Sequence, residues 1–265
     1  QIVDKILVPT NHADAVASNM RKIQDRYYYL PNFVAKETGL DQTSLENFSA
    51  MYDYQLEGVA AAIAAHKRGE SYILGWQTGI GKGRVVASVM QYARKQGLLP
   101  VFVTDRPDLF SSMMEDTYNI GGIKEDGDFV PFVTNNATES SAINLNANIE
   151  GFGERKQVQG KSESESAMER MAVRRGRLVD GDKKYDAVFT TYEQMRPNKG
   201  LTYRNNFINN IAERAFFILD ESHKIGEGKG RNADGTEQLS TGSFLRDAIA
   251  ASRGALFSSA TFSKT

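Results

Sequence analysis

The sequence predicts an α/β fold in which a mostly parallel central sheet is covered by helices on both faces. Short apolar runs bounded by turn residues recur along the chain, and helical segments separate several of them. One run leads through a glycine-rich loop directly into a helical segment. Strands that alternate with helices in this way are typical of parallel sheets, whose strands are buried on both faces.

Composition limits the class of protein before any motif is considered. The 265 residues are 40% hydrophobic and 25% charged, which suits a soluble globular protein with one large domain or two small ones. A formal net charge of −1 argues against a polycationic nucleic-acid coat but allows a local basic groove. The absence of cysteine excludes disulfides and thiolate metal sites. No apolar stretch approaches the ~20 residues that span a bilayer, so we expect no membrane partner and a cytoplasmic, nuclear or virion-associated protein.

The first fifty residues are expected to form a helical extension before the main domain. A helix is expected over 14–24, and the alanine-rich segment Leu56–His66 predicts another, with Gly69 as its stop signal. The role of this extension, over 1–50, is open on sequence alone, and packing against the core sheet of a single lobe over 51–265 is the simplest interpretation.

Six apolar runs are expected as buried strands. They are Tyr72–Leu74, Val101–Thr104, Phe129–Val133, Ala187–Thr190, Phe216–Leu219 and Leu256–Ser258. The third contains Pro131, which cannot donate a backbone hydrogen bond and therefore suits an edge strand. A helix is expected after the first strand, because Val85, Val86, Val89 and Met90 repeat on one face. Further helices are expected over 207–213 and 244–251.

The stretch 134–184 differs in composition from the rest of the chain. It is rich in Asn, Ser, Glu and Gly, so we expect a partly mobile insertion between two core strands. It ends in a basic segment that looks helical, with arginines at Arg170, Arg174, Arg175 and Arg177. A solvated helix face is the favoured interpretation of this segment, and added affinity for nucleic acid is the alternative. A second glycine-rich loop is expected over 226–242.

The most informative segment, Gly75–Arg84, follows an expected strand and opens an expected helix. Its three glycines after Thr78 would let backbone N–H groups turn inward around phosphate oxygens, with the helix N-terminus behind them. Lys82 would reach the β- and γ-phosphates. The match to the P-loop pattern is incomplete, because Trp76 replaces the first glycine and Gly83 replaces the Ser or Thr that binds Mg²⁺. A plain glycine-rich turn with a solvated lysine is the alternative.

Two adjacent carboxylates, Asp220 and Glu221, follow the strand expected over 216–219. The first can hold the Mg²⁺ shell, and the second can orient or deprotonate an attacking water. A strand that ends in two acids is common and, alone, can be a solvated strand end. Together with the glycine-rich lysine loop upstream, the pair predicts a nucleotide site.

In chain order, these segments resemble the motifs of the first motor lobe of superfamily 2 helicases and translocases. The matches are Gln55 to the Gln motif, Gln77–Gly83 to motif I, 101–106 to motif Ia, Thr190–Glu193 to a further strand-end motif, Asp220–His223 to the DExH form of motif II, and Ser259–Thr261 to motif III. The resemblance covers Tyr52–Thr261 and implies a RecA-like P-loop NTPase lobe, a three-layer sandwich.

The Gly-Lys-Gly-Arg ending of the P-loop narrows the resemblance to the strawberry notch family, including modules in phage and plasmid antirestriction proteins. That family has Asp-Glu-Cys-His-Lys in motif II, whereas Ser222 replaces the cysteine here. The start at Gln1 and the end after motif III suggest a lobe from a longer polypeptide. A second RecA-like lobe in that polypeptide would supply arginine fingers, so this lobe alone is expected to bind ATP weakly and hydrolyse it poorly.

The resemblance implies roles for the motif residues, with ATP and Mg²⁺ as cofactors. Gln55 would read the adenine edge, and the rest of the nucleotide would be held by Thr78, Gly79, Ile80, Gly81, Lys82, Gly83 and Arg84. Asp220 would bind Mg²⁺, with Thr78 as a weakly supported replacement for the missing hydroxyl, and Glu221 would position the water. His223 would couple the nucleotide to Ser259 and Thr261. Nucleic acid, expected to be DNA, would make backbone contacts with Thr104, Arg106 and Thr191.

Two other functions remain open on sequence alone. A degenerate nucleotide-binding scaffold or DNA-binding module without turnover would explain Trp76 and Gly83, although the intact pair at 220–221 argues against it. A P-loop kinase or transferase would need neither Gln55 nor the Ser-Ala-Thr segment. The favoured function is an ATP-driven DNA helicase or translocase lobe.

Overall fold

The computed structural model describes residues 10–76, 79–123, 129–196, 202–222 and 241–259. Its centre is a six-stranded sheet in the order β1-β11-β10-β2-β9-β3, in which every neighbouring pair is parallel. The strands are β1 (Tyr72–Leu74), β2 (Leu99–Thr104), β3 (Pro131–Val133), β9 (Ala187–Thr191), β10 (Ala215–Leu219) and β11 (Gly254–Ser258). The expected α/β class and all six expected strands are confirmed, and the strand that contains Pro131 lies at an edge of the sheet.

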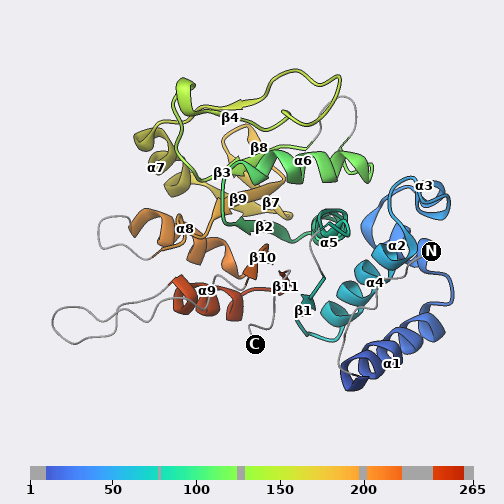
Figure 1. Cartoon of the computed structure of the whole chain (residues 1–265). Helices are drawn as coiled ribbons and strands as arrows, with labels where there is room; N and C mark the ends of the chain where they lie inside the picture. The colour runs from blue at the N-terminus through green and yellow to red at the C-terminus, as the bar shows by residue number, and fades with distance from the viewer. Residues whose placement is uncertain (1–9, 77–78, 124–128, 197–201, 223–240, 260–265) are drawn as a thin grey trace.

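Helices cover both faces of this sheet and make the three layers of a RecA-like lobe (Figure 1). One face carries α4 (Asp53–Lys67), α5 (Lys82–Lys95) and α6 (Leu109–Asn119), and the other carries α8 (Thr202–Ala212) and α9 (Thr241–Ala250). Strand β10 shows why two cores form. Its Phe216 and Ile218 belong to one apolar cluster and Phe217 and Leu219 to the other, because successive side chains of a strand point to opposite faces.

The N-terminal residues form three helices, α1 (Thr10–Tyr27), α2 (Leu30–Thr38) and α3 (Gln42–Glu46). The break after α1 has Tyr28 at φ 41°, and Pro31 lies in the first turn of α2, where a proline is tolerated. The main contacts of α1 and α2 are with α4 and α5. The extension therefore packs on the helical layer, and the expectation that it packs on the sheet is corrected. Within the described residues, no helix is both long and apolar enough to cross a membrane.

The segment between β3 and β9 forms elements of its own. They are a 3₁₀ helix (Glu139–Ser141), β4 (Ile143–Asn144), β5 (Lys156–Gln157), α7 (Lys161–Arg170), β6 (Ala172–Arg174), β7 (Arg177–Asp180) and β8 (Lys183–Tyr185). The expected basic helix is wrong beyond Arg170. Arg174 and Arg177 pair across an antiparallel hairpin, and its two-residue turn has positive φ at Arg175 and Gly176, the backbone of a tight hairpin turn.

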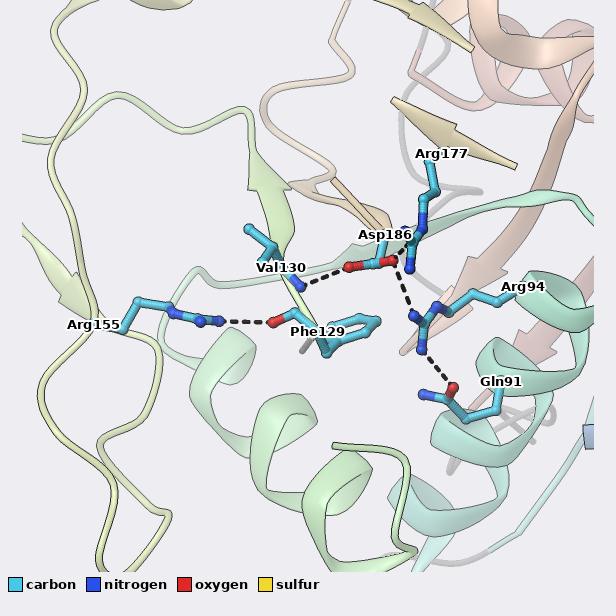
Figure 2. A network of polar contacts seen from close by, with 7 residues as sticks. All are labelled: Gln91, Arg94, Phe129, Val130, Arg155, Arg177 and Asp186. Atoms are coloured by element: carbon cyan, nitrogen blue, oxygen red, sulfur yellow. Dashed lines mark hydrogen bonds and ion pairs between the residues drawn. The ribbon is translucent and has the colours of Figure 1, made fainter. Parts of the chain in front are cut away.

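The buried carboxylate of Asp186 ties this segment to the core (Figure 2). Its Oδ1 accepts hydrogen bonds from Arg94 of α5 at 2.9 Å and pairs with Arg177 of the hairpin at 2.8 Å. Its Oδ2 accepts from the backbone N–H of Val130 at 2.9 Å, just before β3. The Arg94 guanidinium also lies 4.9 Å from the centre of the Phe129 ring. These three contacts offset the cost of burying the Asp186 carboxylate. They also hold α5, the hairpin and the start of β3 together at this edge of the sheet.

Asp186→Ala should therefore cost about 3–5 kcal/mol of unfolding free energy, because it removes the carboxylate that pairs with Arg94 and Arg177 and accepts from the Val130 N–H. Asp180→Ala is the matched control, since Asp180 pairs with Arg170, which is 58% exposed, and should cost less than about 1 kcal/mol. Urea unfolding of the two variants measures both values. Equal losses would show that the Asp186 network does not hold the segment.

Candidate functional site

The register of the parallel sheet brings several strand ends to one edge. Leu219 of β10 is level with Val103 of β2 and with Phe257 of β11, and Leu74 of β1 is level with Ser258. Ladder hydrogen bonds continue one residue further, from Asp220 N to Val103 O (2.8 Å) and from Ser259 N to Leu74 O (3.2 Å). The carboxyl ends of β1, β2, β10 and β11 therefore lie at one edge of the sheet, where ligands bind in open α/β sheets.

The glycine-rich loop after β1 has the backbone that glycine permits. Gly79 and Gly81 have φ of 87° and 72°, in the left-handed region. Gly81 is the N-cap residue of α5 and makes no side-chain cap bond. The first N–H groups of a helix have no partner within it, so the start of α5 at Lys82 is open to an anion.

Gln55, at the start of α4, is tied to this loop. It is only 2% exposed, and its Oε1 accepts a hydrogen bond from Tyr52 N at 2.8 Å. Its Nε2 donates to Gly81 O at 3.0 Å and to Ile80 O at 3.5 Å. A Cβ on Gly81 would overlap Gln55 Nε2, so the close approach also requires glycine. Both ends of the amide are bonded to backbone, and adenine reading by Gln55 stays a prediction.

Lys82, at the start of α5, lies beside the carboxylates that follow β10. Lys82 Nζ is buried, has no hydrogen-bond partner among the described residues, and lies 3.9 Å from Glu221 Oε1. A buried ammonium with unused donors is a costly arrangement that an anionic ligand would relieve. Burial and the nearby Glu221 charge raise the pKa of Asp220, and the Lys82 charge opposes that rise. Glu221 has φ 50°, a strained conformation for a residue other than glycine, and such strain is common at functional sites.

Neighbouring strands hold Asp220 in place. Thr104 Oγ1 donates to Asp220 Oδ2 at 3.5 Å, and Tyr192 Oη donates to Asp220 O at 2.7 Å. Burial and the charge of Asp220 raise the pKa of Tyr192, which keeps its hydroxyl protonated as a donor. The conformation of the first acid is thus set from β2 and from the residue that follows β9.

The residues expected to contact nucleic acid differ in exposure. Thr104 and Thr191 are buried, and the hydroxyl of Thr191 accepts from Asn135 Nδ2 at 3.4 Å. Arg106 is 65% exposed and pairs with Asp108 at 3.3 Å. Of the three, only Arg106 presents its side chain to solvent in this structure. Contact between either threonine and nucleic acid would need the strand ends to open, and it stays a prediction.

The other predicted residues are placed as follows. Arg84 donates from Nη1 to Ala50 O at 2.8 Å, Ile80 is 38% exposed, and Ser259 is buried. Thr78, His223 and Thr261 lie outside the described residues, as does most of the loop expected over 226–242.

Sequence reasoning missed Asp116, on α6. A Cβ on Gly83 would overlap Asp116 Oδ2 and lie 2.6 Å from its Cγ, so this carboxyl group lies directly against the glycine. Burial, followed by the charge of Glu115, raises the pKa of Asp116 to about 6; Arg84 opposes this rise and Asp220 adds to it. No motif marks this residue, because a single acid on a helix carries no sequence signal.

Aromatic side chains beside the loop were also missed as a group. Tyr52 and Tyr54 are 58% and 42% exposed, and their rings stack with centres 5.9 Å apart. The ring of Trp76 lies 5.6 Å from that of Tyr54 and packs so closely on Gly58 that a Cβ there would lie 2.9 Å from it. Trp76, which replaces the first P-loop glycine, therefore packs on α4.

The site suits Mg²⁺ bound together with a nucleotide rather than a metal held by protein alone. In the described ranges, no group of three or more His, Cys, Asp or Glu could hold a metal ion by itself. Mg²⁺ commonly takes one or two carboxylates and completes its shell with phosphate oxygens and waters. The Lys82 ammonium, which has no hydrogen-bond partner within the described ranges, fits such a nucleotide complex, as does the Asp116 carboxyl group against Gly83.

Comparisons with known proteins give one family and several solved structures. The family described as "Type III restriction enzyme, res subunit" matches residues 48–241. A structure of a nuclease-deletion mutant of the type ISP restriction-modification enzyme LlaGI, in complex with a DNA substrate mimic, is 14% identical, with a TM-score of 0.45 over 81% of this chain. A hypothetical ATP-dependent RNA helicase from Sulfolobus tokodaii is 13% identical, with a TM-score of 0.42 over 89% of this chain. The chain spans 18% and 51% of the lengths of these two proteins. No curated protein matches it.

Fold and site together define a helicase-like ATP-binding lobe. The chain belongs to the family of type III restriction enzyme res subunits, since the matched residues 48–241 are most of its length and include both the glycine-rich loop and the Asp220–Glu221 pair.

The Gln55 contact predicts different costs for alanine at two glycines of the loop. Gly79→Ala should cost about 1–2 kcal/mol from left-handed backbone strain alone, because a Cβ there meets nothing within 4 Å. Gly81→Ala adds the overlap with Gln55, so it should cost at least about 1 kcal/mol more. Denaturant unfolding measures the difference, and equal costs would contradict the described packing of Gln55 on the loop.

The raised pKa of Asp116 predicts a pH dependence of stability. A carboxyl group whose pKa is higher in the folded state favours folding when protonated, so the free energy of unfolding should fall as pH rises from about 4 to about 6. The contribution is at most about 3 kcal/mol. Asp116→Asn should remove it, whereas Glu115→Gln should keep most of it. Unfolding curves at several pH values test this, and parallel profiles for wild type and Asp116→Asn would contradict it.

Proposed function

We propose that this chain is the ATP-binding first motor lobe of a superfamily 2 DNA helicase or translocase of the DExH type. The observation that carries the proposal is the buried Lys82 ammonium, which has no hydrogen-bond partner in the described part of the chain and lies 3.9 Å from Glu221 Oε1 at the carboxyl edge of the sheet. Beside it, the uncapped start of α5 supplies N–H donors. A cation, backbone donors and two carboxylates at one strand edge are what a Mg-nucleotide requires.

Each residue of the site has a proposed task in ATP hydrolysis. Lys82 and the backbone of Gly79–Gly83 bind the phosphates. Asp220, oriented by Thr104, holds Mg²⁺, which when bound neutralises charge on the phosphate oxygens. Glu221 orients the attacking water and accepts its proton. The adenine lies near the loop, where Gln55 reads its edge if its amide exchanges partners, and the exposed Tyr52 and Tyr54 rings offer a stacking surface.

The proposed partners are DNA and a second RecA-like lobe in the same longer polypeptide. Arg106 is exposed after β2 and would contact the DNA backbone. The second lobe would supply arginines that stabilise the transition state, an effect of about 10³–10⁵ in rate in related systems. The Gly-Lys-Gly-Arg ending of the loop supports a place near the strawberry notch proteins and phage or plasmid antirestriction modules.

Three variants of the two-lobe protein test this function. Glu221→Gln should bind ATP but lose about 10²–10⁴ in DNA-stimulated hydrolysis, because the water loses its base. Lys82→Ala should abolish hydrolysis through loss of nucleotide binding. Lys95→Ala removes the same charge from the far end of α5, where Nζ donates to Lys36 O, and should hydrolyse ATP like wild type.

Nucleotide binding by equilibrium titration and phosphate release with and without DNA give both readouts. Full hydrolysis by Lys82→Ala and Glu221→Gln would contradict the proposal. Tight ATP binding by wild type without turnover, with the second lobe and DNA present, would favour the nucleotide-binding scaffold instead.

A further inference from the structure

Gly83 and Asp116 share one small volume at the start of α5. A Cβ on Gly83 would overlap Asp116 Oδ2, with Oδ1 at 3.1 Å and Cγ at 2.6 Å, whereas real Cβ contacts essentially never come below 3.0 Å. The carboxylate oxygen therefore lies in the space that the side chain of a serine or threonine at position 83 would occupy. Neither of those residues fits there while Asp116 keeps its place.

In a P-loop, the side chain at this position normally binds Mg²⁺. The residue after the loop lysine normally supplies a hydroxyl oxygen to Mg²⁺, and Gly83 has none. Mg²⁺ is a hard cation that prefers carboxylate oxygen to most other protein ligands. The charge of Asp220 is one cause of the raised pKa of Asp116, so the two carboxyl groups interact electrostatically.

The surroundings distinguish this carboxylate from an ordinary surface acid. Glu115, the next residue on α6, and Asp220 add negative charge, and Arg84 is the cation that opposes them. Arg84 donates its own hydrogen bond to Ala50 O. Like charges held together are costly until a cation enters, and the Lys82 ammonium, without a hydrogen-bond partner among the described residues, can take an anion. A Mg-nucleotide brings both.

We propose that the carboxylate of Asp116 replaces the missing P-loop hydroxyl and supplies an oxygen ligand to the Mg²⁺ of a bound Mg-nucleotide. The inference rests on the proposed nucleotide site. It explains why glycine follows Lys82 here, since any side chain at position 83 would displace the replacement ligand. It also places a residue from α6, which packs on α5, in the metal site.

The first test compares metal binding with metal-free nucleotide binding in the full chain. Mn²⁺ affinity of the ADP complex is measured by electron paramagnetic resonance, and ADP affinity in EDTA by calorimetry. Asp116→Asn should weaken Mn²⁺ binding by about 10-fold or more. It should leave ADP affinity in EDTA equal or higher, because one repelling charge is gone. A purely structural role would lower both affinities together.

Glu115→Gln is the matched control, because it removes the same charge from the same helix one residue away. Because Glu115 acts only through its charge and is not proposed as a ligand, Glu115→Gln should weaken Mn²⁺ binding much less than Asp116→Asn does. Asp116→Asn keeps the size of the side chain, and its fold is checked by the thermal unfolding midpoint.

The second test moves the ligand back to the loop. Gly83→Ser alone should lose Mn²⁺ affinity, since its side chain overlaps Asp116. Asp116→Ala alone should lose it for lack of a ligand. The double variant Gly83→Ser/Asp116→Ala restores a hydroxyl in the vacated space, so its Mn²⁺ affinity should exceed that of Asp116→Ala by about 10-fold.

The outcomes separate this inference from the proposed function. If wild type binds no ADP in either condition, the nucleotide site itself is wrong and the inference fails with it. If ADP binds but Asp116→Asn keeps wild-type Mn²⁺ affinity, only the role of Asp116 is overturned. The same holds if the double variant binds Mn²⁺ no better than Asp116→Ala.

Discussion

The constraint on which the rest of this structure depends is the parallel register of β1, β11, β10 and β2. Because these strands run in one direction and end at the same level, the loop after β1 faces the acids after β10. A shift of one residue in β10 would exchange Phe216 and Ile218 with Phe217 and Leu219 between the two cores and disrupt the close packing of both. Core packing thus positions the polar site.

The site stores unfavourable interactions that the cores offset. Among the residues that the structure describes, Lys82 has no hydrogen-bond partner and Glu221 has a strained backbone, and burial and neighbouring charges raise the pKa values of Asp116 and Asp220. A fold selected for stability alone would remove such features, since each costs free energy in the ligand-free protein. A bound Mg-nucleotide would relieve several of them at once, which gives binding a physical driving force.

Much of the fold could be predicted from sequence, because strand burial, helix periodicity and the glycine-rich loop are local signals. The edge position of β3 could be predicted because Pro131 lacks a backbone N–H, which can be read from the sequence alone. The helix predicted through Arg177 failed because the hairpin depends on a two-residue turn and on the pairing of Arg177 with Asp186, which is itself held by Arg94, 92 positions away. Asp116, the bonded state of Gln55 and the burial of Thr104 were equally invisible, since each arises from contacts between segments far apart in the chain.

The central claim is that a Mg-nucleotide binds at the carboxyl edge, between the glycine-rich loop and the acids after β10. A crystal structure of the chain grown with a non-hydrolysable ATP analogue and Mg²⁺ tests it most directly. The account predicts phosphate oxygens within hydrogen-bond distance of Lys82 Nζ, and Mg²⁺ about 2.1 Å from an oxygen of Asp116. A nucleotide bound elsewhere, with the Lys82 ammonium still unbonded, would contradict it.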